Sequence, residues 1–291
     1  MLYRSLGRQS PTSDAGMRHD SIFRIFSMTK PIVSTAIMTL FEEGRLLLDD
    51  PLTKFIPEFA DQKVAVEKDG KLDLVSLARP ITVQDLLRHT SGITYEHTGN
   101  GPVHKMYQES RLRSRKIDNA EHARIVASLP LICQPGAEWI YSRSTDILGR
   151  VVEVVSGQTL GTYLTERILA PLRMTETGFH TSADNRDRLA EPFANDPWTG
   201  DAVKLFDMTE KPAMESGGGG LVSTTMDYAR FCQMLLNGGT LDGERIIGRK
   251  TLAFMASDHL GPAMPRNGTL LTPGHSFGLG FCVRTDEGMA S

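Results

Sequence analysis

The sequence predicts a mixed α/β (α+β) fold in one large domain, and three observations support this. Apolar residues recur at helical spacing from Met28 to Phe41 and in several later segments. Short stretches near the two ends, at 2–7 and 277–283, have the pattern of strands instead. A chain of 291 residues, with 40% hydrophobic and 23% charged content, is long enough to bury a substantial core.

The first helix is predicted to begin within a few residues of Ser27. Pro31 has no backbone N–H and therefore fits only in or near the first turn of a helix. Gly44 suits the position just after the last turn. The apolar residues fall at positions 28, 32, 33, 36, 37, 40 and 41, so we expect a helix that buries one face. Ser27 and Lys30 then share one side of its first turn.

These two residues are candidate catalytic groups. A serine hydroxyl is a poor nucleophile at neutral pH and needs a neighbour that takes its proton. A lysine crowded by burial or by other cations can be partly neutral and can serve that purpose. The spacing Ser-x-x-Lys alone is weak support, because many such tetrapeptides are only solvated helix starts.

The segments that follow predict short helices and loops. A capping box formed by Thr82 and Asp85 opens one helix, and Ser144 is expected to cap another that ends before Gly157. Thr224, three residues before Asp227, is expected to cap the helix over 228–236. The remaining expectations are a short helix ending near Phe59, a hairpin or loop over 63–80, an irregular lid over 95–117, helices over 119–129, 159–168, 228–236 and 250–255, and a hairpin turn at 285–288. Since the chain stops soon after that turn and begins abruptly, we expect a domain that is incomplete at both ends.

Composition excludes several classes of function. The net charge of −3 gives no indication of nucleic-acid binding, and the short basic run 111–116 is typical of a solvated face. Three widely separated cysteines argue against a disulfide framework or a zinc site and favour a reducing, cytoplasmic compartment. No membrane or export segment is predicted. Gly217–Gly220 lacks the residues of a phosphate-binding loop and suggests close backbone packing, so no cofactor or metal is expected.

A second candidate cluster is Trp139-Ile140-Tyr141-Ser142, in what we expect to be a short exposed link between packed elements. The phenol of Tyr141 could act as a general base or acid beside a lysine ammonium, although a tyrosine near a tryptophan more often serves packing. His89, at a helix end, is more typical of a histidine that bonds backbone carbonyls than of a catalytic group.

The order Ser27-Met28-Thr29-Lys30 followed by Trp139-Ile140-Tyr141-Ser142 resembles the serine β-lactamase and penicillin-binding-protein superfamily. It is most similar to the class C β-lactamase branch and the family VIII carboxylesterases. Segments 86–92, 217–227 and 277–280 also resemble that branch, so the resemblance spans about residues 20 to 283.

The resemblance implies a β-lactamase/transpeptidase-like fold, with an antiparallel sheet flanked by helices and a mostly helical subdomain inserted at approximately 60–210 of a single domain over 1–291. It further implies that Ser27 is the acylated nucleophile and that its N–H is one oxyanion donor. Lys30 would be its proton-accepting or charge-stabilising neighbour. Tyr141 would be the base that also protonates the leaving group.

Two departures from the family pattern bear on the substrate. Arg143 stands where the β-lactamases have asparagine, which weakens a β-lactam-specific contact and favours the esterase pattern. The third family element, Lys-Thr-Gly or His-x-Gly on a strand, is not found after residue 143. His97-Thr98-Gly99 has the right letters but lies between the first two elements, so we interpret it as a coincidence and expect the third element beyond Gly288.

The favoured function is a serine hydrolase that forms an acyl-Ser27 intermediate, most simply a carboxylesterase whose substrate is a small ester or amide. The same chemistry would serve a β-lactamase or a D-alanyl-D-alanine carboxypeptidase, because pocket shape selects the substrate. An alternative of another class is a non-catalytic ligand-binding relative or an inactive fragment. The sequence leaves the acyl group and the oligomeric state open.

Overall fold

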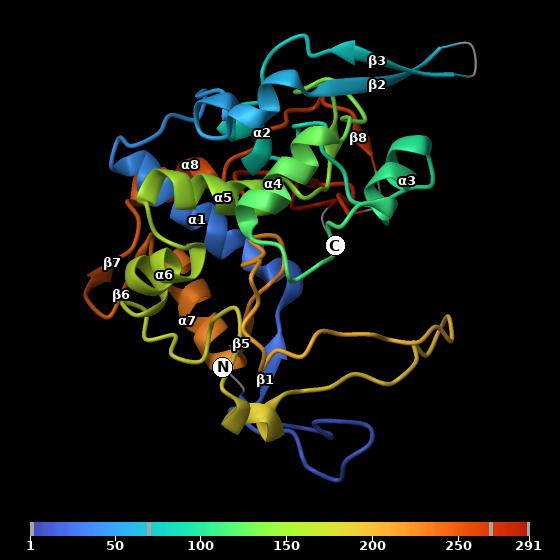
Figure 1. Cartoon of the computed structure of the whole chain (residues 1–291). Helices are drawn as coiled ribbons and strands as arrows, with labels where there is room; N and C mark the ends of the chain where they lie inside the picture. Colours follow the sequence, from blue (N-terminus) through green and yellow to red (C-terminus); the bar gives the residue numbers. More distant parts are fainter. Residues whose placement is uncertain (1–2, 69–70, 268–269, 290–291) are drawn as a thin grey trace.

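The structure, a computed structural model, describes residues 3–68, 71–267 and 270–289, and most of its core is helical (Figure 1). The helices are α1 (Thr29–Glu42), α2 (Val83–Leu87), α3 (Pro102–Glu109), α4 (Asn119–Ser128), α5 (Ser144–Ser156), α6 (Leu160–Leu164), α7 (Thr225–Leu236) and α8 (Arg249–Met255). The strands are β1 (Ile22–Arg24), β2 (Lys63–Lys68), β3 (Lys71–Ser76), β4 (Trp139–Ile140), β5 (Val222–Thr224), β6 (Thr240–Leu241), β7 (Glu244–Arg245), β8 (Arg266–Asn267), β9 (His275–Phe277) and β10 (Cys282–Arg284).

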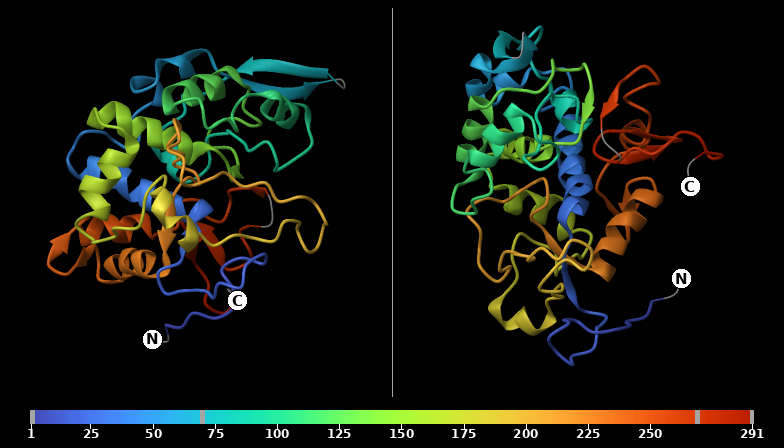
Figure 2. Two further views of the ribbon diagram at one scale, coloured as in Figure 1. Left: turned by 60° about the horizontal axis from the view of Figure 1, so that its bottom comes forward. Right: turned by 90° about the vertical axis from the view of Figure 1, so that its right-hand side faces the viewer.

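Helix α1 lies in the middle of the molecule. The right-hand view of Figure 2 shows it between the green helices on one side and the orange and red segments on the other, and it packs against α5 and α6. Residues 32–40 are all buried, so the expectation of a single buried face is wrong. Polar members of this run are covered too, because segments from both halves of the chain surround the helix. Its end agrees with the sequence: Gly44 has φ +68° and donates to the Phe41 carbonyl at 2.9 Å.

The described strands pair two by two. Strands β1 and β5 are antiparallel, with Ile22 opposite Thr224 and Arg24 opposite Val222, and this pairing brings the 217–221 turn to the start of α1. Pairs β2–β3, β6–β7 and β9–β10 are also antiparallel, whereas β4 and β8 run parallel. The predicted hairpin over 63–80 is therefore confirmed, although its turn at 69–70 lies outside the described residues.

The segment 277–283 is not the single strand that the sequence predicts. It is the turn of the β9–β10 hairpin, and the alternation of large and small residues reflects close packing at that turn. A Cβ at Gly280, where φ is +104°, would lie 2.2 Å from the Ser34 side chain, and one at Gly278 would lie 2.2 Å from the Met255 carbonyl. At the other end, residues 3–7 form no strand, and position 2 lies outside the described part of the chain.

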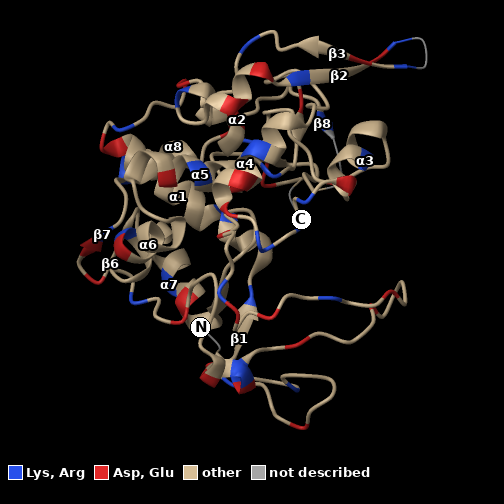
Figure 3. Ribbon diagram, in the orientation of Figure 1, with Lys and Arg blue, Asp and Glu red and all other residues tan. Residues whose placement is uncertain are grey.

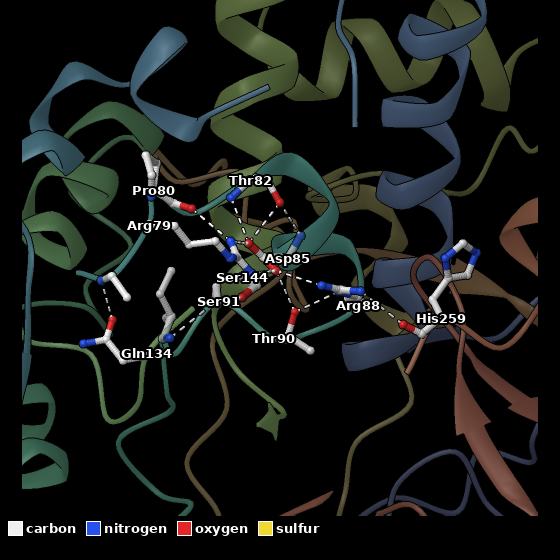
Figure 4. Close-up of polar contacts among 12 residues, drawn as sticks. Arg79, Pro80, Thr82, Asp85, Arg88, Thr90, Ser91, Gln134, Ser144 and His259 are labelled. Carbon is white, nitrogen blue, oxygen red and sulfur yellow. Dashed lines mark hydrogen bonds and ion pairs between the residues drawn. The ribbon is translucent and has the colours of Figure 1, made fainter. Parts of the chain in front are cut away.

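The link that carries Tyr141 is packed rather than exposed, which corrects the expectation from sequence. Trp139 is 1% exposed and Ser142 is fully buried. Strand β4 pairs with β8, and the Ile140 N–H donates to the His89 carbonyl, next to Thr90, which donates to the buried carboxylate of Asp85. Figure 4 shows that carboxylate at the centre of its contacts. It accepts hydrogen bonds from Arg79, Arg88, Thr90 and the Thr82 cap, and the adjoining Ser91 hydroxyl contacts that of Ser144 at 2.8 Å.

Most of the predicted helices are found with small shifts. Helices α4, α6, α7 and α8 match the predicted segments, with α7 beginning three residues early and α6 continuing in a π-helical turn to Leu169. Both capping predictions at Thr82 and Thr224 are confirmed. Arg143, not Ser144, is the cap residue of α5, and α3 lies inside the segment predicted to be irregular. Figure 3 shows charges of both signs spread over the elements, and the described helices are all too short or too polar to span a membrane.

Candidate active site

A tight turn presents Ser27 at the N-terminal end of α1. After β1, Phe26 takes up a left-handed conformation with φ +42°, which costs a non-glycine residue about 1–3 kcal/mol and is found mainly where the surrounding structure enforces it. The 3₁₀ turn Phe26–Met28 then leads directly into α1. As a result Ser27 is exposed, while Thr29, two residues later, is fully buried.

Lys30 points back at this serine. Its side chain is buried, with the residue only 2% exposed, and its Nζ lies 3.1 Å from Ser27 Oγ and donates to the Gly218 carbonyl at 2.6 Å. A neutral amine at this point could donate one N–H to Gly218 and direct its lone pair at the serine hydroxyl. The geometry therefore suits a group that takes the proton from Ser27.

Tyr141 lies on the other side of the lysine. Its ring centroid is 4.6 Å from Lys30 Nζ, and the residue lines one cavity together with Ser27. Within the described part of the chain, its hydroxyl has no hydrogen-bond partner, so it is available to a bound molecule. His89 packs against the back of this ring, with the centroids 4.9 Å apart. The structure thus brings all three sequence-predicted site residues together.

His89 is placed as a supporting residue. It is 1% exposed, its Nδ1 lies 3.2 Å from the Ser142 hydroxyl rather than at a backbone carbonyl, and it does not line the cavity. Burial, aided by the charge of Lys30, lowers the pKa of His89 well below its usual range, so the ring is neutral at neutral pH and fixes Tyr141 through packing.

The sequence did not point to Tyr95, whose ring also faces the lysine. Its centroid lies 5.5 Å from Lys30 Nζ and 5.7 Å from that of Tyr141, and burial raises the pKa of Tyr95 well above 10. The neighbouring His97-Thr98-Gly99 lies in a loop and not on a strand beside α1, although His97 does line the cavity. No motif marks Tyr95, because it reaches the site only through the fold of the 93–97 loop.

A buried group of charges forms the wall behind these residues. Arg143 donates to both oxygens of Glu96 at 2.8 Å and lies 3.8 Å from Asp146. Burial would raise the pKa of Asp146, but the charges of His122 and Arg143 and the hydrogen bonds that it accepts hold that pKa below its usual range. The Arg143 guanidinium is therefore held by the Glu96 carboxylate, with Asp146 beside it.

Asp146 connects this wall to the lysine. Its Oδ1 accepts from the Ser216 hydroxyl at 2.6 Å and from the Gly218 N–H at 2.9 Å, and Gly218 is the residue whose carbonyl binds Lys30. A Cβ at Gly218 would lie 2.7 Å from Asp146 Oδ2, which confirms the predicted close packing of the glycine run. The sequence carries no signal for this role, because Asp146 lies on the polar side of the α5 pattern together with Arg150 and Glu153 and is buried only by the fold.

The cavity above Ser27 has a volume of about 450 Å³. Its walls include Phe206, Met214 and Leu221 beside the polar groups already described. Over the described residues, no three His, Cys, Asp or Glu side chains are grouped closely enough to hold a metal ion. The contact between Ser27 and Lys30 suits formation of a covalent adduct at Ser27, and the apolar walls of the cavity can accommodate a largely apolar molecule.

Comparisons with known proteins agree with this chemistry. The family described as Beta-lactamase matches residues 1–290. Protein Rv1367c of Mycobacterium tuberculosis is 39% identical over 94% of this chain and 69% of its own length, and Esterase EstB of Burkholderia gladioli is 36% identical over 75% and 53%. The solved structure of EstCE1, "a hydrolase with promiscuous acyltransferase activity", superposes with a TM-score of 0.76 at 26% identity, over 97% of this chain and 74% of its own.

Proposed function

Since this chain belongs to the β-lactamase family of serine hydrolases, we propose that it is a carboxylesterase that hydrolyses small esters through an acyl-Ser27 intermediate. One observation carries the proposal: Lys30 Nζ lies 3.1 Å from Ser27 Oγ, and Ser27 lines a cavity. A serine with a buried amine at this distance has the proton acceptor that a nucleophile requires.

The reaction uses three side chains in turn. Ser27 Oγ bonds to the ester carbonyl carbon while its proton passes to Lys30, and the resulting tetrahedral intermediate expels the alcohol, which takes a proton from the Tyr141 hydroxyl. Water then attacks the acyl carbon, and its proton returns through Tyr141 as Ser27 leaves with the proton held by Lys30. Ester and water are consumed, and an acid and an alcohol are formed.

The position of Arg143 supports an ester over a β-lactam. Where β-lactamases have asparagine, this guanidinium is held by Glu96 on both oxygens, so the residue offers no amide to a β-lactam ring. The similarity to Esterase EstB points in the same direction. Hydrolysis of β-lactams or of D-alanyl-D-alanine peptides would use the same acyl-serine step. Comparing the turnover of a chromogenic cephalosporin with that of 4-nitrophenyl butyrate separates β-lactamase from esterase activity.

Acyl transfer to an alcohol is a second candidate activity. The same acyl-Ser27 intermediate can react with an alcohol in place of water, and EstCE1 is described as having both activities. A largely apolar cavity favours an alcohol over water once the acyl group is bound. Adding a short alcohol to the esterase assay should then produce the exchanged ester.

The test is acylation of the chain by 4-nitrophenyl butyrate or a fluorophosphonate, followed by intact-mass spectrometry. We expect one adduct, on Ser27, and none in Ser27→Ala. Ser114→Ala is the matched control, because Ser114 lines the same cavity and its hydroxyl, among the described residues, is bonded to the Lys116 backbone N–H and to no side chain. Equal labelling of wild type and Ser27→Ala would instead support a non-catalytic relative. Faster turnover of a chromogenic cephalosporin than of the butyrate would favour the β-lactamase alternative.

A further inference from the structure

The charges that line the cavity are unequal. Five arginine and lysine side chains contribute to its lining, against two carboxylates, although the whole chain has a net charge of −3. Both carboxylates, Glu96 and Asp146, are engaged with Arg143 in the buried wall. In the described part of the chain, the other four cations that line the cavity, Arg24, Arg113, Arg115 and Lys204, make no ion pair with either of these carboxylates.

Two of these cations are occupied by protein groups. Arg24 makes a two-pronged ion pair with Glu191. Arg115 donates to the backbone carbonyls of Asp207 and Glu210 and lies over the Phe206 ring at 5.2 Å. These contacts join the 111–115 segment to the long 191–207 loop that projects from the body of the molecule in Figure 1.

Arg113 and Lys204 are different. Both line the cavity, one from each of the two joined segments, and both are exposed. Across the described ranges 3–68, 71–267 and 270–289, neither side chain has a hydrogen bond or an ion pair. In the neighbouring loop Asp207 is bound by Arg186 and Glu191 by Arg24, Asp196 accepts the N–H groups of Trp198 and Thr199, and among the described residues Asp201 makes no ion pair with either cation. The opening therefore carries two unpaired positive charges above apolar walls.

We propose that this opening binds an anionic group of the substrate, so that the preferred ester carries a carboxylate away from its reacting carbonyl. The apolar wall would contact the hydrocarbon part, and Arg113 and Lys204 would contact the carboxylate at the edge of the solvent. Like charges on two flexible side chains are better accommodated by a bound anion than by each other. This inference rests on the proposed esterase function and specifies its substrate class.

The test compares pairs of esters in which one carboxylate is free in one member and methylated in the other. Mono-4-nitrophenyl glutarate is paired with its methyl ester to place the carboxylate on the acyl side. 4-(Butanoyloxy)benzoate is paired with its methyl ester to place it on the alcohol side. The second-order rate constant for acylation of Ser27 is measured by intact-mass spectrometry. In at least one pair we expect the anionic ester to react roughly two- to thirtyfold faster, the range for two exposed charge pairs.

The preference should disappear in the double variant Arg113→Gln/Lys204→Gln, with the rate for the neutral esters unchanged within about twofold. Lys116→Gln is the matched control, because Lys116 is an exposed lysine on the same segment that does not line the cavity. Raising the ionic strength from about 0.01 M to 1 M shortens the screening length from roughly 30 Å to 3 Å and should also remove the preference.

Two negative results are distinguishable. If neutral esters acylate Ser27 but neither carboxylate ester is preferred, or if the preference survives in the double variant, the anionic-substrate inference is wrong and the esterase function stands. If no ester of either kind acylates Ser27, the proposed function itself fails.

Discussion

Replacing Arg143 with methionine tests whether the buried charges hold the wall of the cavity. Arg143 makes three hydrogen bonds of 2.8–3.1 Å to the Glu96 carboxylate, and the side chains of Arg143, Glu96 and Asp146 are at most 10% exposed. Methionine has a comparable length but donates no hydrogen bond, so Glu96 would remain buried without its partner. Breaking a buried pair in this way costs about 3–5 kcal/mol.

Proton uptake by Glu96 limits that cost. The ordinary pKa of the carboxyl group is 4.5, which is 2.5 pH units below pH 7. Protonating the group at pH 7 therefore costs about 3.4 kcal/mol, at 1.36 kcal/mol per unit. We therefore expect Arg143→Met to lower the free energy of unfolding by about 3 kcal/mol at pH 7. The same calculation gives about 0.7 kcal/mol at pH 5.

The sign of this pH dependence follows from the folded protein. Burial would raise the pKa of Glu96, but the charge and hydrogen bonds of Arg143 lower it. The stabilisation is then fully present above the pKa of the unfolded chain and is lost as the pH falls through the folded value. In the variant burial acts without Arg143 and raises the pKa of Glu96, so its destabilisation grows with pH above 4.5 and disappears as the pH falls toward that value. The difference between wild type and variant should therefore shrink from pH 7 to pH 5.

Urea unfolding followed by circular dichroism at pH 5, 6 and 7 measures the difference. Arg150→Met is the matched control, because Arg150 lies on the same helix and pairs with Glu153 while 32% exposed, a type of pair worth at most about 1 kcal/mol. A loss below about 1 kcal/mol in Arg143→Met at pH 7, or a loss that is the same at pH 5, would refute the reasoning.

Three further predictions concern neighbouring groups. Gly218→Ala places a Cβ 2.7 Å from Asp146 Oδ2 and displaces the carbonyl that binds Lys30, so acylation by 4-nitrophenyl butyrate, followed by mass spectrometry, should slow about tenfold or more. His122 has its pKa lowered by burial from 6.5 to about 4. The wild type should therefore lose about 3 kcal/mol of unfolding free energy between pH 6.5 and 4, and urea titrations of His122→Gln should lack that loss. Thr82→Ala removes a helix cap and should cost about 1 kcal/mol in the same unfolding assay.

Features set by neighbouring residues could be predicted from the sequence. The Gly44 end of α1 and the caps at Thr82 and Thr224 depend on backbone groups within four residues, so local letters are enough. The burial of α1 on every side could not be predicted, because it depends on which distant segments cover the helix. The β9–β10 hairpin was missed for the same reason: Gly278 and Gly280 are needed where the turn meets Met255 and Ser34.

The candidate site divides in the same way. Ser27 and Lys30 share one helical turn, and their 3.1 Å contact could be expected from spacing alone. Tyr141 came from the resemblance to a family, because no local pattern places a residue more than 100 positions away. Tyr95 had neither signal, and its approach to Lys30 follows from the ion pair that fixes the adjacent Glu96.

The position of the lysine depends on a helix that carries no nucleophile. Asp146 lies in the first turn of α5, five residues after Tyr141, and it accepts a hydrogen bond from the Gly218 N–H. The carbonyl of Gly218 in turn accepts a hydrogen bond from Lys30. One helix start therefore positions both the phenol and the acceptor of the amine. Because a misplacement of about 1 Å can cost a hundredfold in rate, a cavity in the buried face of α5, such as that left by Val151→Ala, should slow acylation although no group that touches the substrate is removed.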